Sequence, residues 1–383
     1  MAAGVKQIKG DLVGDESYFN GAPVGSGWEW EDLTWSYGAQ VSALTINDNA
    51  IDLNIRPGDR IGAPVSITTG PPSSSFMTIV NRATTTAKGT RGDLRIYRGL
   101  GANSLRLRGR CQWATRVCGR VSIPDPALAF VSMLRDALIK RGVKIDGRVR
   151  TVNSHSGESI VRRMPSWLTG TAGGGDQPLV EIASHLSESF SSVAAQTLKP
   201  SQNQYTELIL RTLGRTRIQT LAGTVGTQEV SSFEADGRDD EENGLEVVKK
   251  FLRQAGVGDS DVALNDGSGL SRNDLISANT TVQLLTFMSK HKYFAQFREA
   301  LPIAGVDGTL RTRMRGTPAE GNVRAKTGSL SSVASLSGYV TTAAGEHLVF
   351  SMMLNNYPDA AAVRRDSIDA IAVLLASFSG KTQ

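Results

Sequence analysis

Three consecutive residues, Lys326, Thr327 and Gly328, carry the groups needed to hold a carboxylate beside an extended peptide. The lysine ammonium attracts a carboxylate, and the threonine hydroxyl donates a hydrogen bond to it. Glycine has no side chain, so a second backbone can approach it closely. The backbone N–H of Ser329, just beyond, is placed to face a developing oxyanion. Because tripeptides of common residues also occur by chance in turns, this motif alone predicts little.

A second polar group, Ser201-Gln202-Asn203, stands directly before a predicted amphipathic helix that we expect to end at Gly214. Serine and asparagine are favoured helix caps, which is the simple interpretation of this stretch. In the functional interpretation, the Ser201 hydroxyl relays a proton and the Asn203 amide holds a substrate carbonyl. Two Gly- and Asp-rich loops follow, "DGSGLSR" at 266–272 and "LPIAGVDGTLRTRM" at 301–314.

Taken in order with "AKTGSLSSVASLSGYV" (325–340), these motifs resemble one family of enzymes. Ser-x-Asn and Lys-Thr-Gly are two of the three signatures of penicillin-binding proteins and serine β-lactamases. The whole set resembles the D-alanyl-D-alanine carboxypeptidase/endopeptidase family, the class C low-molecular-mass penicillin-binding proteins of peptidase family S13. The resemblance spans nearly the whole chain and is strongest from Ser201 to Tyr339.

The resemblance implies an α+β fold: a penicillin-binding-protein/β-lactamase-like domain with an antiparallel sheet flanked by helices, plus a β-rich inserted domain. It implies hydrolysis of the terminal D-Ala-D-Ala bond of peptidoglycan stem peptides, or of a cross-link between them, through an acyl-enzyme that β-lactams also form. It implies no cofactor and a periplasmic or extracellular location. The implied catalytic residues are Ser201, Asn203 and Lys326, and the implied substrate-binding residues are Thr327, Gly328 and Ser329.

The acylating serine of the family belongs to a Ser-x-x-Lys motif that precedes the inserted region, with the lysine one helical turn away. The only Ser-x-x-Lys in this chain is Ser289 to Lys292, between the other two motifs and at the polar end of a predicted helix. We therefore predict that the nucleophile segment is absent and that the chain is an N-terminally truncated product. The alternative hypothesis is a non-catalytic module, or pseudoenzyme, that binds cell-wall peptides.

The length of 383 residues exceeds what one core usually holds, so more than one domain is expected. The stretch "GTAGGGDQP" at 170–178 is the clearest boundary, because glycine and proline interrupt the pattern there. The predicted parts are 1–20, the remnant of an inserted subdomain; 21–169, a β-rich non-catalytic domain; and 170–383, a transpeptidase-like domain without its Ser-x-x-Lys segment.

Apolar and polar residues alternate over 40–60, 92–100 and 103–110, which predicts strands in the first half. One helix interrupts them, with Pro126 in its first turn and Gly142 just past its end. In the second half, helices are expected at 244–256, which stops at Gly256, and at 278–291, where Thr280 and Gln283 have capping-box spacing. The Lys-Thr-Gly strand should open a three-stranded antiparallel meander, covered by an amphipathic helix at 359–378.

The composition bounds the remaining possibilities. A net charge of +5 suits an anionic polymer, but the basic residues are scattered, so no nucleic acid partner is expected. No apolar run is long enough to span a bilayer, and the N-terminal residues lack the apolar core of a signal peptide.

The four dispersed histidines predict no metal site. Cys111 and Cys118 flank a predicted hairpin, where a disulfide and two separate thiols fit equally well.

Overall fold

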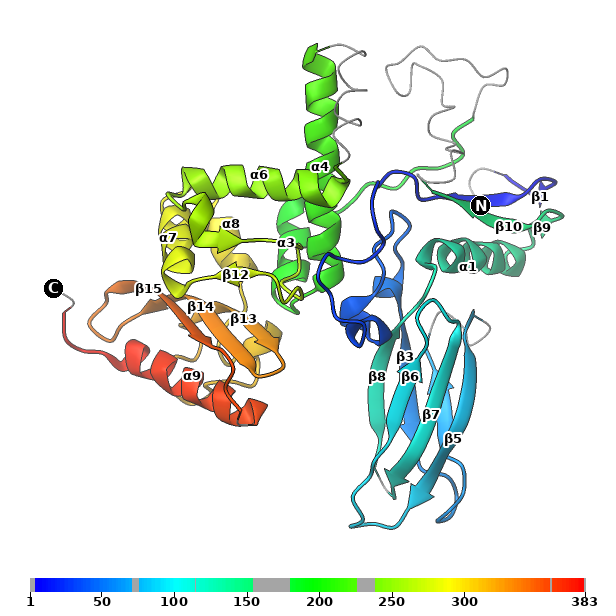
Figure 1. Ribbon diagram of the computed structural model, residues 1–383, viewed down its shortest axis with the longest axis horizontal. Coiled ribbons are helices and arrows are strands. Elements are labelled where there is room, and N and C mark those ends of the chain that lie inside the picture. Colours follow the sequence, from blue (N-terminus) through cyan, green and yellow to red (C-terminus); the bar gives the residue numbers. More distant parts are fainter. Residues whose placement is uncertain are drawn as a thin grey trace. The chain divides into compact units, whose positions relative to one another are not determined.

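The chain divides into two compact units, residues 1–185 with 221–241 and residues 186–220 with 242–383 (Figure 1). The structure, a computed structural model, describes residues 4–70, 76–113, 115–153, 180–225, 238–358 and 360–381. The predicted boundary stretch at 170–178 lies outside the described residues, so the three predicted parts stay a prediction. Each unit is described below by itself.

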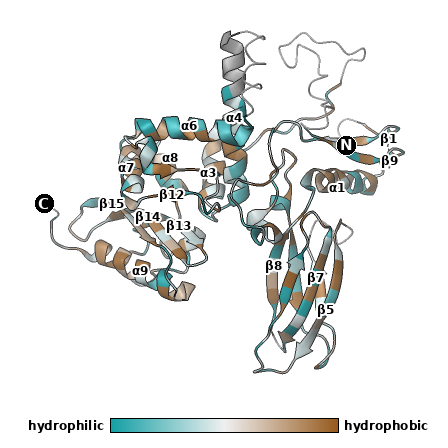
Figure 2. Cartoon of the chain, in the orientation of Figure 1, coloured by the Kyte–Doolittle hydropathy of each residue, from teal (hydrophilic) through white to brown (hydrophobic). Residues whose placement is uncertain are grey.

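The first unit contains two three-stranded sheets that share one hydrophobic core. Hydrophobic and hydrophilic residues alternate along strand β7 (Figure 2), so that one face of this strand is buried. Ile51, Leu53, Leu105 and Leu107 are almost fully buried in that core. One sheet has the order β4 (Ser66–Thr69), β3 (Ala50–Arg56), β8 (Val117–Ser122), and the other has β5 (Thr78–Thr86), β7 (Ser104–Gln112), β6 (Arg95–Arg98).

A smaller part of the same unit contains helix α1 (Pro126–Lys140), which begins and ends as predicted. The Asp125 side chain caps it by accepting from Leu128 N at 3.0 Å, and Gly142 beyond its end has a φ of +85°. Two short parallel pairs pack beside α1, β1 (Gln7–Ile8) with β9 (Lys144–Ile145) and β2 (Leu12–Asp15) with β10 (Val149–Val152). Strands β1 and β2, near the start of the chain, therefore pair with strands that follow α1.

Two expectations for this unit were wrong. The alternation over 40–60 forms a strand only over Ala50–Arg56, because Asn47, Asp48 and Asn49 all adopt positive φ just before it. Asparagine and aspartate tolerate that conformation and so end the extended run. The two cysteines do not flank a hairpin: Cys111 lies on β7 and Cys118 on β8, in different sheets, and both are free thiols.

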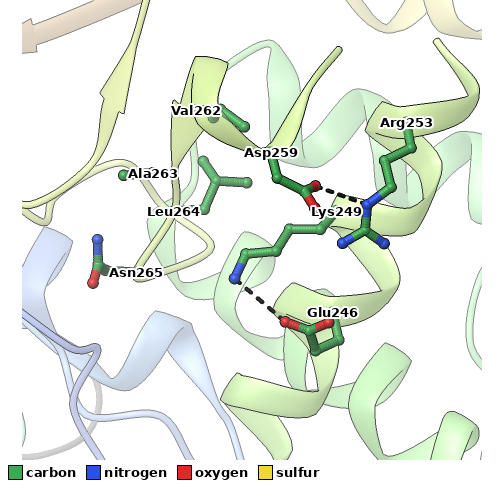
Figure 3. A pocket seen from close by; sticks show the side chains of 8 residues that line it. All are labelled: Glu246, Lys249, Arg253, Asp259, Val262, Ala263, Leu264 and Asn265. Atoms are coloured by element: carbon green, nitrogen blue, oxygen red, sulfur yellow. Dashed lines mark hydrogen bonds and ion pairs between the residues drawn. The ribbon is translucent and has the colours of Figure 1, made fainter. Parts of the chain in front are cut away.

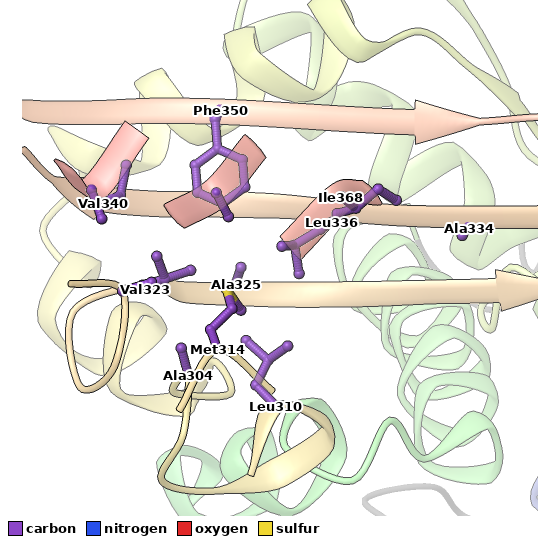
Figure 4. Close-up of a cluster of buried hydrophobic side chains, with 13 residues drawn as sticks. Ala304, Leu310, Met314, Val323, Ala325, Ala334, Leu336, Val340, Phe350 and Ile368 are labelled. Atoms are coloured by element: carbon purple, nitrogen blue, oxygen red, sulfur yellow. The ribbon is translucent and has the colours of Figure 1, made fainter. Parts of the chain in front are cut away.

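The second unit is built on the predicted antiparallel meander, in the order β13 (Arg324–Leu330), β14 (Val333–Thr341), β15 (His347–Leu354). The C-terminal helix α9 (Ala361–Ser377) covers one face, as expected. Ala325, Leu336, Val340 and Phe350 from the strands pack there against Ile368 of α9 (Figure 4). The Lys-Thr-Gly strand β13 lies at the edge of this sheet.

Helices cover the opposite face of the sheet. Tyr339 of β14 packs there with Leu285 and Leu301, and its hydroxyl donates to the Leu285 carbonyl oxygen at 2.8 Å. The helices of this unit are α3 (Phe190–Leu198), most of α4 (Asn203–Val225), most of α6 (Asp240–Gln254), α7 (Ala278–Ser289) and α8 (Phe294–Ala300), with the short pair β11 (Val262–Ala263) and β12 (Leu275–Ile276). No helix among the described residues is long and apolar enough to cross a membrane.

Three helix ends differ from expectation. Helix α4 continues through Gly214 to Val225, since an isolated glycine weakens a helix by only about 1 kcal/mol and no proline follows. Helix α7 is capped by Ser277, which accepts from Thr280 N at 3.0 Å, so Thr280 lies in the first turn and is not the cap. Helix α6 begins at Asp240, four residues earlier than predicted, and Gly256 follows its end at φ +84°.

Residues 301–316, which lie between α8 and β13 in the sequence, contact both the sheet and α9. Their backbone pairs with the start of β13, through Ala304 N to Val323 O at 2.9 Å and Ala325 N to Pro302 O at 3.0 Å. Farther along, Arg313 binds both carboxylate oxygens of Asp369 on α9 at 2.5 to 3.1 Å. Both side chains of this ion pair are largely buried, with 13% and 17% of their surface exposed.

Removing the charge of Asp369 should destabilise the second unit, because the Arg313 guanidinium would stay buried without its counter-ion. We expect Asp369→Asn to lower the free energy of unfolding by about 3 kcal/mol, measured by denaturant titration followed through the helical circular dichroism signal. The matched control is Asp366→Asn on the same helix, whose pair with Arg365 is exposed; it should cost less than about 0.5 kcal/mol. Equal losses in the two variants would contradict the assignment.

Candidate active site

Strand β13 presents Lys326 to the helix-covered face of the sheet. In the register with β14, Lys326 lies opposite Ser337 and Thr327 lies opposite Leu336. Leu336 belongs to the core under α9, so Lys326, one residue away, points to the other face. The alternation of the strand thus directs the Lys326 ammonium toward the helices.

The turn that carries Ser201 closes the end of helix α3. Gln202 N donates to the Thr197 carbonyl oxygen at 2.8 Å, across Ser201, whose φ is +64°. This is the helix-ending geometry in which glycine is usual, because a Cβ atom is strained at positive φ. Helix α4 then begins at Asn203. The serine therefore occupies a left-handed position between two helices, where its hydroxyl is held in a fixed direction.

The structure brings Ser201 and Lys326 together, although 125 residues separate them. The Lys326 Nζ donates to Ser201 Oγ at 2.5 Å and to the Thr327 carbonyl oxygen at 2.7 Å. Burial lowers the pKa of the Lys326 ammonium to about 8. Near neutral pH the group still carries its charge, yet it can lose a proton far more readily than an ordinary lysine.

The other predicted residues lie around this contact. Thr327 Oγ1 donates to Thr309 Oγ1 at 2.9 Å, and Ser329 is exposed farther along β13. An added Cβ on Gly328 would come within 2.4 Å of the Ser335 hydroxyl on β14, so packing inside the sheet is one reason for glycine here. Asn203 is half-buried in the first turn of α4.

Sequence reasoning missed the residues that hold the "DGSGLSR" loop. The fully buried Glu207, one turn along α4 from Asn203, accepts from Gly267 N at 2.9 Å. Asp266 accepts backbone N–H groups from Gly269, Leu270 and Ser271 at 2.7 to 3.1 Å. Burial first, and then the neighbouring Asp266 carboxyl, raise the pKa of Asp274 to about 7. The Asp-Gly-Ser-Gly pattern was a signal for a tight loop, but its buried partner on α4 was not visible in the sequence.

Ser289 and Lys292 do not form a nucleophile and base. Ser289 is the last residue of α7, and its hydroxyl donates to the Thr286 carbonyl oxygen at 2.7 Å. The Lys292 ammonium is exposed and lies 5.0 Å from the centre of the Tyr293 ring. The arrangement agrees with the prediction of a polar helix end.

A cavity of about 430 Å³ lies elsewhere in the second unit, and none of the predicted site residues lines it (Figure 3). Its charged wall is formed by two ion pairs, Lys249 with Glu246 at 3.3 Å and Arg253 with Asp259 at 2.7 Å. In the part of the chain that the structure describes, no group of three or more His, Cys, Asp or Glu side chains is arranged to hold a metal ion.

Comparison with solved structures identifies the fold. The crystal structure of penicillin binding protein 4 (dacB) from Haemophilus influenzae matches 98% of this chain and 77% of that chain, with a TM-score of 0.73 and 23% sequence identity. The same protein complexed with a novel β-lactam matches with a TM-score of 0.65 and 21% identity. The α+β fold expected from the motifs, that of a penicillin-binding protein, is therefore confirmed.

Comparison of sequences identifies the family. The model of the D-Ala-D-Ala carboxypeptidase 3 (S13) family matches residues 1–167 and 169–378, so the chain belongs to that family, as predicted. A D-alanyl-D-alanine carboxypeptidase of Actinomadura sp. (strain R39) is 32% identical over 99% of this chain, and DacB of Haemophilus influenzae is 27% identical over 92%. The chain spans 65% and 66% of the lengths of these relatives.

The strained conformation of Ser201 gives a test of the turn. Both Ser201→Gly and Ser201→Ala remove the hydroxyl that accepts from Lys326, but only glycine also removes the Cβ that is strained at positive φ. We expect the glycine variant to be more stable than the alanine variant by about 1 kcal/mol, measured by denaturant titration. An alanine variant as stable as the glycine variant would show that residue 201 is not held in the left-handed conformation.

Proposed function

We propose that this chain carries the substrate-carboxylate side of a serine D-Ala-D-Ala carboxypeptidase site, acting on peptidoglycan stem peptides outside the cytoplasmic membrane. The observation that carries the proposal is the 2.5 Å contact between Lys326 Nζ and Ser201 Oγ. Membership of the S13 family and the activity for which the relatives are named support it.

Each residue has a role in this proposal. The Lys326 ammonium and the Thr327 hydroxyl bind the C-terminal carboxylate of the peptide, which lies extended along β13. The Asn203 amide orients the carbonyl of the penultimate residue, and the backbone N–H of Ser329 stabilises the oxyanion. Ser201, hydrogen-bonded to a lysine whose pKa lies near 8, passes a proton to the leaving amine. The acylating serine of the family is assigned to no residue of this sequence.

The proposal predicts binding of a D-Ala-D-Ala peptide with a characteristic pH dependence. Because the carboxylate needs the protonated Lys326, affinity should be full below about pH 7 and should fall by up to tenfold for each pH unit above the lysine pKa of about 8. Isothermal titration calorimetry with a diacetyl-L-Lys-D-Ala-D-Ala peptide measures it.

The controls separate carboxylate binding from other contacts. The same peptide with a C-terminal carboxamide should bind at least tenfold more weakly, and Lys326→Met should bind weakly at every pH. Binding that is unaffected by the carboxamide or by Lys326→Met would refute the proposed role of β13.

A fluorescent penicillin tests for covalent chemistry in this chain. With no Ser-x-x-Lys in the family position, we expect no covalent band after incubation and denaturing electrophoresis. A band that disappears in Ser201→Ala or in Ser289→Ala would identify that residue as an acylated serine and would overturn the present assignment of roles.

A further inference from the structure

Two residues outside the family's signature motifs tie the Ser201 turn to the segment before β13. The Lys199 ammonium, two residues before Ser201, forms an ion pair with Asp307 at 2.6 Å and donates to the Leu301 carbonyl oxygen at 3.0 Å. The other oxygen of Asp307 accepts from Ile303 N at 2.9 Å. Three-quarters of the Lys199 side chain and two-thirds of the Asp307 side chain are buried.

The backbone reinforces this ion pair. Thr309 N donates to the Lys199 carbonyl oxygen at 2.9 Å. Gly308 between Asp307 and Thr309 has a φ of +56°, and a Cβ there would lie 2.6 Å from that same carbonyl oxygen. The two segments are therefore in direct contact, and a side chain at residue 308 would force them apart.

The same short stretch reaches the Lys-Thr-Gly strand. The hydroxyl of Thr309, two residues after Asp307, contacts the Thr327 hydroxyl at 2.9 Å. Upstream, Pro302 and Ala304 are hydrogen-bonded to the start of β13. Residues 301–310 therefore contact the Ser201 turn on one side and the strand of Lys326 on the other.

We propose that Lys199 and Asp307 are positioning residues, whose ion pair sets the distance between Ser201 Oγ and Lys326 Nζ. The inference deepens the proposed function, since it explains how that site keeps its geometry. Neither residue needs to touch the substrate. Without the pair, the Ser201 turn moves away from β13, and the Lys326 ammonium becomes more exposed to water.

The test reads the titration of Lys326 directly, without peptide, in the full chain. Protein labelled with ¹³C at the lysine ε carbon is titrated by NMR, and the Lys326 signal, one of twelve, is assigned by its loss in Lys326→Arg. In the protein without substitutions, the chemical shift of this carbon should report a Lys326 pKa near 8. In Asp307→Asn we expect the Lys326 pKa to rise by about one unit or more toward the ordinary lysine value.

The direction of the shift separates positioning from simple electrostatics. Removing the negative charge of Asp307 would by itself lower the pKa of a nearby lysine. The double variant Lys199→Met/Asp307→Asn removes both charges, leaves no unpaired buried ion, and should also raise the Lys326 pKa. It replaces the single variant as the test if Asp307→Asn does not fold.

Lys249→Met is the matched control, because the Lys249–Glu246 pair lies in the same unit with similar exposure (Figure 3). It should leave the Lys326 titration unchanged. An unchanged or lowered Lys326 pKa in the Asp307 and double variants, or an equal rise in Lys249→Met, would overturn the inference. If the protein without substitutions bound no peptide while its Lys326 ammonium titrated near pH 8, that result would count against the proposed function alone.

Discussion

The hydrogen bond between Lys326 and Ser201 is the constraint on which the candidate site depends. It joins a sheet edge to the turn between two helices, and both partners are in demanding surroundings: the lysine is partly desolvated, and the serine has a left-handed backbone. Each condition alone is unfavourable, since burial disfavours the charged ammonium and positive φ strains a Cβ. Strain of this kind persists where the surrounding structure over-determines it, and it is common at functional sites.

The surroundings that hold this bond come from one segment, residues 301–316. It pairs with the start of β13, contacts the Ser201 turn through Asp307, and anchors α9 through Arg313. Backbone pairing on one side and ion pairs on the others leave this segment few alternative conformations. The two faces of the sheet are consequently linked: a helix packed on the far side of β13 stabilises the loop that meets the Ser201 turn.

Much of the second unit could be predicted from local patterns. The meander, the covering helix and the end of α6 before Gly256 follow from strand alternation and a glycine stop, which act over a few residues; in the first unit, the end of α1 before Gly142 follows in the same way. The partners Lys199–Asp307 and Glu207–Gly267 could not, since they lie 108 and 60 residues apart and nothing local marks them. The end of α4 was misplaced for a related reason: Gly214 is buried within the helix, where packing outweighs its weak helix propensity. The hairpin expected between Cys111 and Cys118 does not form, because the two strands that are adjacent in sequence join different sheets.

The edge position of β13 also bears on solubility. Edge strands can recruit extended segments of other molecules, and natural proteins discourage such aggregation with charged side chains, including inward-pointing ones. Arg324 and Lys326 supply two positive charges within the first three residues of β13. The backbone of this end of β13 is also paired with Pro302 and Ala304, so pairing as well as charge protects the start of the edge strand.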